Sequence, residues 1–137
     1  MVTVLLDTNA IAEPVRPEPN AGFVRRLRAN EAKMAIASVT LHEARYGIER
    51  LPDGKRKRML REYLRDVVAR LPVLAYDTQA AEWHARERVR LEATGRPLPY
   101  ADGQIAAIAV VHCLTLVTSN VRDFRYVEGL RVEDWRD

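Results

Sequence analysis

The stretch Val2–Asn9 constrains this chain most strongly, because an almost uninterrupted apolar run ends there on a carboxylate. Val2, Val4, Leu5 and Leu6 form the kind of short, branched apolar run that is typical of a strand buried on both faces of a parallel sheet. Asp7 then follows at the carboxyl end of that strand, which is where ligands bind in open α/β sheets. A second interpretation is that Asp7 only caps the next helix or opens a turn.

Further apolar runs alternate with helical patterns along the chain. Besides the first, the predicted strands are Met34–Ser38, Pro72–Tyr76, Leu114–Thr118 and a last edge strand at Leu130–Val132. The predicted helices cover Ala21–Ala29, Thr40–Leu51, Lys55–Leu71, Thr78–Ala93 and Ala101–His112. This alternation predicts an α/β fold with three layers, in which helices flank a central, mostly parallel sheet of four or five strands with right-handed crossovers. The length of 137 residues fits one domain spanning 1–137.

The composition excludes several classes of protein. Hydrophobic residues make up 47% and charged residues 30% of the chain, as in ordinary globular proteins. The single cysteine, Cys113, rules out an internal disulfide framework, and we expect it to be a small core residue. The apolar stretches at Val2–Leu6 and Ile105–Val111 are too short for a signal peptide or a membrane span. We therefore expect a cytoplasmic protein without a membrane partner.

Four acids occupy similar positions in the predicted topology. Asp7 ends the first strand, Glu43 begins the helix after the second, Asp102 begins the helix before the fourth strand, and Asp123 lies in the loop after that strand. In a parallel sheet all four can converge at one edge. Each also has a purely structural explanation: Thr40 and Glu43 match a capping box, and Asp102 suits the positive end of a helix dipole.

Converging carboxylates would repel one another unless a cation neutralised them. Ligands that are all oxygen suit Mg²⁺ or Mn²⁺ rather than zinc or copper. Mg²⁺ uses one or two carboxylates, retains several waters and often binds phosphate. Such an ion lowers the pKa of a bound water and stabilises the charge that develops at phosphorus. The acids therefore predict a metal-assisted site for phosphodiester hydrolysis.

Basic residues are concentrated in one part of the chain. Between Arg45 and Arg70 there are nine basic residues and four acids, and the net charge of the chain is +3. This run fits either a solvated helical face with ion pairs or a surface that binds phosphates. Arg45 and Arg122 each lie close to one of the four acids and are the candidates for phosphate binding, with an exposed surface role as the alternative.

Four short sequence motifs occur along the chain in a defined order and spacing. They are Asp7-Thr8-Asn9, Thr40-Leu41-His42-Glu43 with Tyr46-Gly47, Tyr100-Ala101-Asp102, and the segment from Leu116 to Phe124. In this order and spacing, over the whole chain, they resemble the PIN-domain ribonucleases, and most closely the VapC and FitB toxins of bacterial type II toxin–antitoxin modules. The resemblance implies a PIN-like fold and a Mg²⁺- or Mn²⁺-dependent endoribonuclease that cleaves tRNA or rRNA. It also implies a homodimer that is held inactive by a cognate antitoxin protein.

The resemblance assigns roles to individual residues. Asp7, Glu43 and Asp102 match the three principal acids of the family, with Asp7 and Asp102 as the direct metal ligands. Some relatives have an aspartate directly after the fourth strand, where this chain has Ser119-Asn120, so Asp123 is the candidate for the fourth acid. Thr8, Asn9, Thr118 and Asn120 are the supporting residues, and Thr118 and Asn120 would orient water or the carboxylates.

Two other interpretations of the same residues differ in function. A phosphoryl-accepting receiver or phosphatase-like domain would have paired acids after the first strand and a lysine after a late strand, and neither is present. No Walker or Rossmann glycine motif occurs either. The second alternative is a catalytically inactive PIN fold that acts by binding protein or RNA, which only metal binding or activity can distinguish.

Overall fold

A computed structural model describes residues 1–137 and contains a five-stranded parallel sheet. The strands are β1 (Val4–Leu6), β2 (Met34–Ala37), β3 (Val73–Leu74), β4 (Thr115–Val117) and β5 (Arg131–Glu133), arranged in the order β3-β2-β1-β4-β5. β1 is central, with Leu6 aligned with Ile36 of β2 on one side and with Val117 of β4 on the other. The predicted α/β fold with a parallel central sheet is confirmed.

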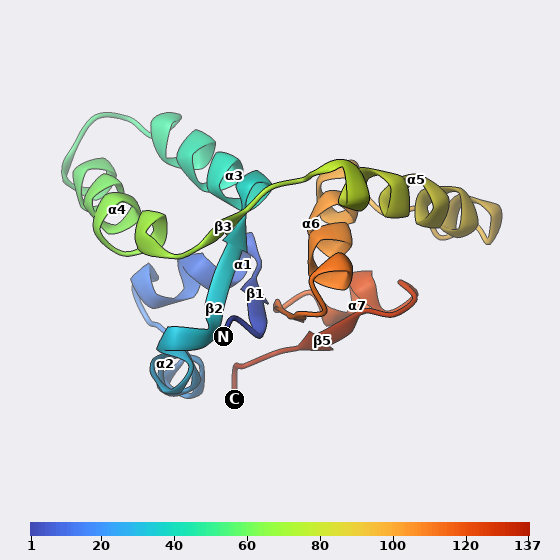
Figure 1. The fold of residues 1–137 in the computed structure, drawn as a ribbon. Helices are drawn as coiled ribbons and strands as arrows, with labels where there is room; N and C mark the ends of the chain where they lie inside the picture. The colour runs from blue at the N-terminus through green and yellow to red at the C-terminus, as the bar shows by residue number, and fades with distance from the viewer.

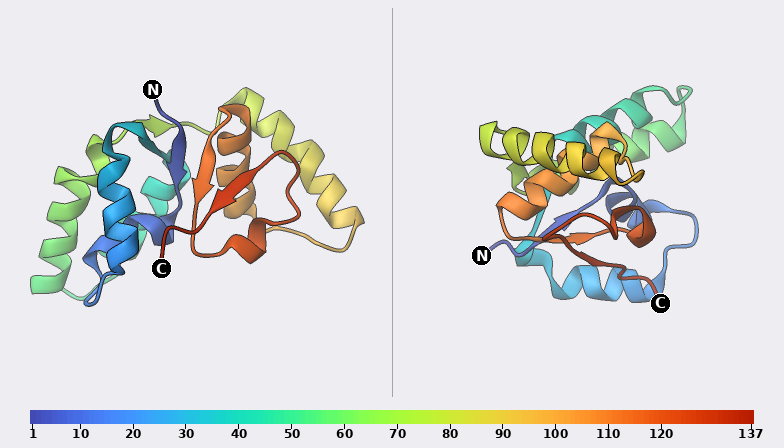
Figure 2. Two further views of the ribbon diagram at one scale, coloured as in Figure 1. Left: turned by 90° about the horizontal axis from the view of Figure 1, so that it is seen from below. Right: turned by 90° about the vertical axis from the view of Figure 1, so that its right-hand side faces the viewer.

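Seven α-helices surround this sheet (Figure 1). They are α1 (Thr8–Ala12), α2 (Ala21–Ala29), α3 (Ser38–Glu49), α4 (Lys55–Asp66), α5 (Thr78–Ala93), α6 (Tyr100–Val111) and α7 (Val121–Phe124). The right-hand view of Figure 2 shows α5 on one side of the sheet and α2 on the other. None of these helices has the length and apolarity needed to cross a membrane.

Alternate residues of β1 belong to two hydrophobic cores, as expected for a strand covered on both faces. Leu5 packs in a core with Ile105 and Ile108 of α6, whereas Leu6 packs in a core with Ile11 of α1 and Leu64 of α4. Trp135 is 5% exposed and closes the second core, with its ring 6.0 Å from that of Phe23.

Several local predictions are wrong. The helix predicted for Lys55–Leu71 ends at Asp66, and a 3-10 turn, Val68–Arg70, follows it. The strand predicted for Pro72–Tyr76 is reduced to Val73–Leu74. Cys113 is exposed rather than in the core, because it forms the turn between α6 and β4 with a left-handed backbone (φ 56°).

The predicted capping box is also wrong. α3 begins at Ser38, directly after β2, so that Thr40 lies inside the helix instead of at its cap. The Thr40 side chain is completely buried and its hydroxyl makes no hydrogen bond. Glu43 consequently lies in the second turn, not the first, and its carboxylate is free to interact outside its own helix.

Candidate active site

Asp7 and Thr118 come together because β1 and β4 are paired in register. Leu6 aligns with Val117, which places Asp7 opposite Thr118 at the carboxyl edge of the sheet. The Thr118 hydroxyl donates a hydrogen bond of 2.8 Å to Oδ2 of Asp7, and the Asn9 amide donates to the same oxygen at 3.2 Å. The Thr8 backbone amide donates to Oδ1 at 2.6 Å. Asp7 therefore caps α1, as its structural interpretation predicted, and is also fixed at the ligand-binding edge.

The hydroxyl of Thr118 fixes more than Asp7. It accepts hydrogen bonds from the Asn9 side chain at 3.2 Å and from the Asn120 backbone amide at 3.0 Å. One donated and two accepted bonds use the full capacity of a hydroxyl group. Asn9 also accepts from the Ser119 backbone amide at 3.0 Å. The loop after β4 is thus tied to the first turn of α1. Asn120 takes part in this network through its backbone, and its side chain makes no hydrogen bond within the chain.

Glu43 reaches the same edge from α3. Its Oε1 accepts a hydrogen bond of 2.7 Å from the Thr8 hydroxyl, which links the residue after β1 to the helix after β2. Thr8 therefore contacts both carboxylates, with its backbone amide on Asp7 and its hydroxyl on Glu43. The role of Thr8 as the direct link between the two acids was not visible in the sequence, where it is simply the residue after Asp7.

Asp102 and Asp123 complete the group of acids. Asp102 lies in the first turn of α6, and Asp123 lies in the four-residue helix α7, not in a loop as predicted. Neither carboxylate accepts a hydrogen bond or forms an ion pair within the chain. The pKa of Asp102 is raised to about 6, mainly by burial and then by the charges of Asp7, Glu43 and Asp123, in that order. The four predicted acids therefore lie close enough together for the charges of the other three to act on Asp102.

Burial also raises the pKa of Asp7, although the hydrogen bonds from Thr118, Thr8 and Asn9 oppose this effect. An ionised carboxylate offers about four lone-pair positions, and these donors occupy three of those on Asp7. The remaining position, with the unpartnered oxygens of Asp102 and Asp123, provides a donor set composed only of oxygen. This chemistry fits Mg²⁺ or Mn²⁺.

The acids do not form a ready-made cage, since no three His, Cys, Asp or Glu side chains are grouped closely enough to enclose an ion. Mg²⁺ takes one or two protein carboxylates and completes its shell with water and substrate phosphate.

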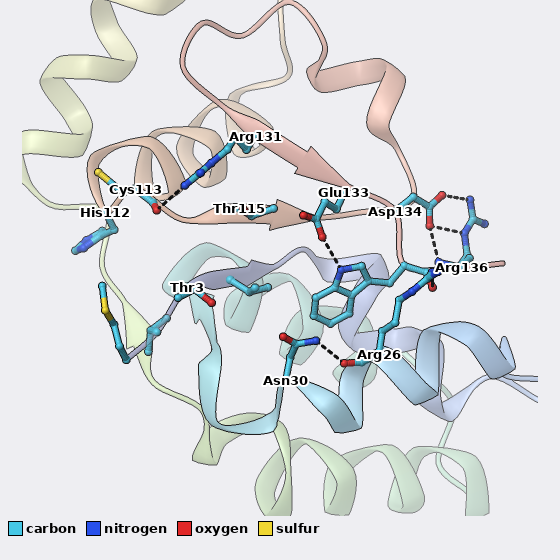
Figure 3. Close-up of a pocket in the computed structure, with 14 residues that line it drawn as sticks. Thr3, Arg26, Asn30, His112, Cys113, Thr115, Arg131, Glu133, Asp134 and Arg136 are labelled. Carbon is cyan, nitrogen blue, oxygen red and sulfur yellow. Dashed lines mark hydrogen bonds and ion pairs between the residues drawn. The ribbon is translucent and has the colours of Figure 1, made fainter.

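The largest cavity of the molecule lies elsewhere. It has a volume of about 970 Å³ and is lined by residues at the start of β1, β4 and β5, by α2 and by the C-terminal segment. Figure 3 shows that its arginines turn toward protein partners: Arg136 pairs with Asp134, Arg26 donates to the Trp135 carbonyl and Arg131 donates to the Cys113 carbonyl. None of the four acids lines this cavity, so its size does not identify the site.

Comparison with known proteins agrees with this geometry. The family model described as "PIN domain" matches residues 4–130. The chain belongs to the PIN-domain family. Among the relatives of this PIN domain, a tRNA(fMet)-specific endonuclease VapC from Shigella flexneri is 38% identical, covering 98% of this chain and 99% of the relative. Toxin FitB from Neisseria gonorrhoeae is 33% identical, again covering 98% and 99%.

A solved structure supports the same assignment. The structure of DNA-bound VapBC from Salmonella typhimurium contains a chain that matches this PIN domain with a TM-score of 0.87 and 34% identity. The match covers 98% of this chain and 99% of the other. The predicted PIN-like fold and the resemblance to VapC and FitB are therefore confirmed.

The raised pKa of Asp102 makes the unfolding free energy of this PIN domain depend on pH. Its pKa is about 6 in the folded protein and 3.8 as the ordinary value, so the folded state binds more protons between these pH values. Without metal, this carboxyl group therefore stabilises the fold below about pH 4, and its contribution is lost as the pH rises through 6. We expect Asp102→Asn, in EDTA, to have a higher unfolding free energy than the wild type at pH 7 and a smaller advantage at pH 4.5.

Urea unfolding at the two pH values measures this difference. Asp66→Asn is the matched control, because Asp66 is exposed on α4 and pairs with Arg65 at 2.8 Å. An Asp102→Asn advantage that is equal at both pH values would contradict the assigned electrostatic origin.

Proposed function

We propose that this PIN domain is a Mg²⁺- or Mn²⁺-dependent endoribonuclease and the toxin of a type II toxin–antitoxin module. The observation that carries the proposal is the convergence of Asp7, Glu43, Asp102 and Asp123 at the carboxyl edge of the sheet. The endonuclease name of the Shigella relative and the toxin name of FitB support it. The Shigella name further makes tRNA the first substrate to test. The protein would act in the cytoplasm, as a homodimer, until a cognate antitoxin inhibits it.

In the proposed mechanism, each acid has a role that follows from its surroundings. Asp7 and Asp102 would hold the metal ion: Asp7 is fixed by three hydrogen bonds, and Asp102 has no competing partner. Glu43, oriented by Thr8, and Asp123 would hold a second ion or position the attacking water. When bound, Mg²⁺ or Mn²⁺ supplies a water of lowered pKa and stabilises the charge that develops on the phosphoryl group.

Most of the basic side chains between Arg45 and Arg70 contact other groups of the protein. Arg61 forms a bidentate ion pair with Glu49, with bonds of 2.9 and 3.0 Å, and Arg45 approaches the same carboxylate at 3.8 Å. The Lys57 ammonium is buried and donates to the carbonyls of Glu49 and Leu51. Arg45 is thus a weak candidate for phosphate binding, whereas Arg122 forms no ion pair and remains one.

The proposal predicts that antitoxin-free protein cuts a total RNA pool into discrete products when Mg²⁺ or Mn²⁺ is present. EDTA should abolish cleavage, and sequencing of the product ends should identify the target RNA and position. Addition of the antitoxin encoded beside the gene should stop the reaction. If folded protein leaves all RNA intact at every metal concentration, the inactive binding module becomes the better interpretation.

A further inference from the structure

A second feature borders the acids on the side of α7. A cavity of about 300 Å³ is lined by Leu91, Leu98 and Val127 together with Arg96, Arg122, Asp123 and Tyr126. Asp123 lines this cavity and its charge also acts on Asp102, so the cavity borders the group of acids at Asp123. Its floor is apolar, and its charged side chains are arginines apart from Asp123 itself.

The arginines around this cavity have no carboxylate partners. Arg96, Arg122 and Arg125 are all exposed, and none of them takes part in an ion pair. This differs from the arginines of α4, where Arg61 and Arg65 are paired with acids at 2.9 and 2.8 Å. The three guanidinium groups are consequently available for an anionic ligand.

Tyr126 provides an aromatic surface among these arginines. Its side chain is 40% exposed, with the Arg96 guanidinium 3.6 Å and the Arg125 guanidinium 4.7 Å from the ring centre. Aromatic rings and arginine planes are the surfaces on which unpaired RNA bases stack. Stacked arginine and tyrosine beside unpaired arginines therefore match the combined base and phosphate chemistry of single-stranded RNA.

The backbone that carries Tyr126 is held in place by α5. Arg90 donates to the Tyr126 carbonyl at 2.7 Å and is itself fixed by two bonds of 2.7 Å to the buried carboxylate of Glu87. The same Glu87 accepts a bond of 2.8 Å from the backbone amide of Glu128. A platform that is already ordered loses little conformational entropy when a ligand binds.

We propose that Tyr126 and Arg96 form a stacking platform for an unpaired base of the RNA substrate, and that Arg122 binds a neighbouring phosphate. The strand would then pass Asp123 into the group of acids. This inference rests on the proposed ribonuclease function and adds to it the region that positions the RNA. It also makes a single-stranded segment, such as a loop, the substrate, because a base inside a duplex cannot reach the platform.

The test is the affinity for a fluorescently labelled single-stranded RNA, measured by anisotropy in Mg²⁺ with Asp7→Asn in every protein to prevent cleavage. Stacking on one aromatic side chain changes affinity by roughly five- to 150-fold, so Tyr126→Leu should weaken binding by at least about fivefold. Tyr126→Phe keeps the ring and should bind normally. Arg122→Gln should lower the salt dependence of log K by about 0.7, the value of one phosphate contact.

Arg28→Gln is the matched control, since Arg28 is an exposed arginine without an ion pair on α2, outside the basic run Arg45–Arg70 and away from α7 (Figure 1). It should change neither affinity nor salt dependence. A duplex RNA of the same sequence should be insensitive to Tyr126→Leu. Unchanged single-stranded RNA affinity in Tyr126→Leu and Arg96→Gln would overturn the inference.

Two further outcomes separate this inference from the proposed function. Loss of antitoxin binding with unchanged RNA affinity in Tyr126→Leu would make this surface a protein interface and would also overturn the inference. RNA binding that depends on Tyr126, in a wild-type protein that never cleaves, would support the platform and refute the catalytic proposal alone.

Discussion

Asp7→Asn should abolish RNA cleavage without weakening the fold. Loss of one ligand of the metal removes several kcal/mol of transition-state stabilisation, so we expect a decrease of more than about 100-fold in cleavage rate. Asparagine is as good a helix cap as aspartate, so α1 should keep its N-terminus. Burial raises the pKa of Asp7, which means that its charge is unfavourable in the metal-free fold. The asparagine amide cannot accept the bonds that Thr118 and Asn9 donate to Oδ2, and this loss offsets the gain from removing the buried charge, so the free energy of unfolding should stay within about 1 kcal/mol of the wild type.

Cleavage of the mapped RNA in Mg²⁺ and urea unfolding in EDTA measure the two parts of this prediction. Asp66→Asn again provides the control, with normal cleavage expected. If Asp7→Asn lost activity together with several kcal/mol of stability, Asp7 would be a structural cap and not a functional carboxylate.

Gly103→Ala should destabilise the protein, although alanine normally stabilises a helix. A Cβ at this position would lie 2.2 Å from Nε2 of His84, which is buried between α5 and α6. The His84 ring cannot easily move away, because its Nδ1 is hydrogen-bonded to the Tyr76 hydroxyl at 2.8 Å. Overpacking of this kind costs about 1–3 kcal/mol, which outweighs the gain of about 1 kcal/mol in helix propensity.

Gly47→Ala is the matched control for this prediction. Gly47 also lies inside a helix, α3, but a Cβ there would meet nothing within 4 Å. We expect this variant to be more stable than the wild type by up to about 1 kcal/mol. His84→Ala should cost less in the Gly103→Ala background than alone, because the clash is then removed. Equal stabilisation by both glycine substitutions would contradict the close contact of His84 and Gly103.

Gly103 also matters for the site, since it follows Asp102 in the first turn of α6. The contact between His84 and Gly103 fixes how closely α5 and α6 pack, and thereby where the Asp102 carboxylate lies. The position of His84 in the pattern of Thr78–Ala93 is typical of a residue at a helix interface. Its partner could not be identified, because the close approach depends on the crossing of two helices whose relative position no local pattern specifies.

The strands and the acids could be predicted because their signals are local. The apolar run before Asp7 and the strand at Leu114–Thr118 have the composition of buried parallel strands, and parallel pairing brings their carboxyl ends together. The contacts of Glu43 could not be predicted in the same way. The motif Thr40-x-x-Glu43 indicated a capping box, yet the hydrogen bond that forms is to Thr8, 35 residues away.

The exposure of Cys113 and the platform at Tyr126 were missed for a similar reason. Cys113 follows a strongly apolar helix, but the chain must turn there to enter β4, and the turn faces solvent. Arg96 and Tyr126 are separated in the chain and meet only because α5 and α7 pack against the same core. Neither residue belongs to a motif that would indicate a shared role.

The assignment of Asp7 and Asp102 as metal ligands is tested most directly by a titration of antitoxin-free protein with Mn²⁺ at pH 7.5, in which electron paramagnetic resonance measures the free ion. We expect saturable binding by the wild type and by Asp66→Asn, with binding lost or greatly weakened in Asp7→Asn and in Asp102→Asn. Mn²⁺ binding of unchanged affinity in both active-site variants would show that these acids do not form the metal site.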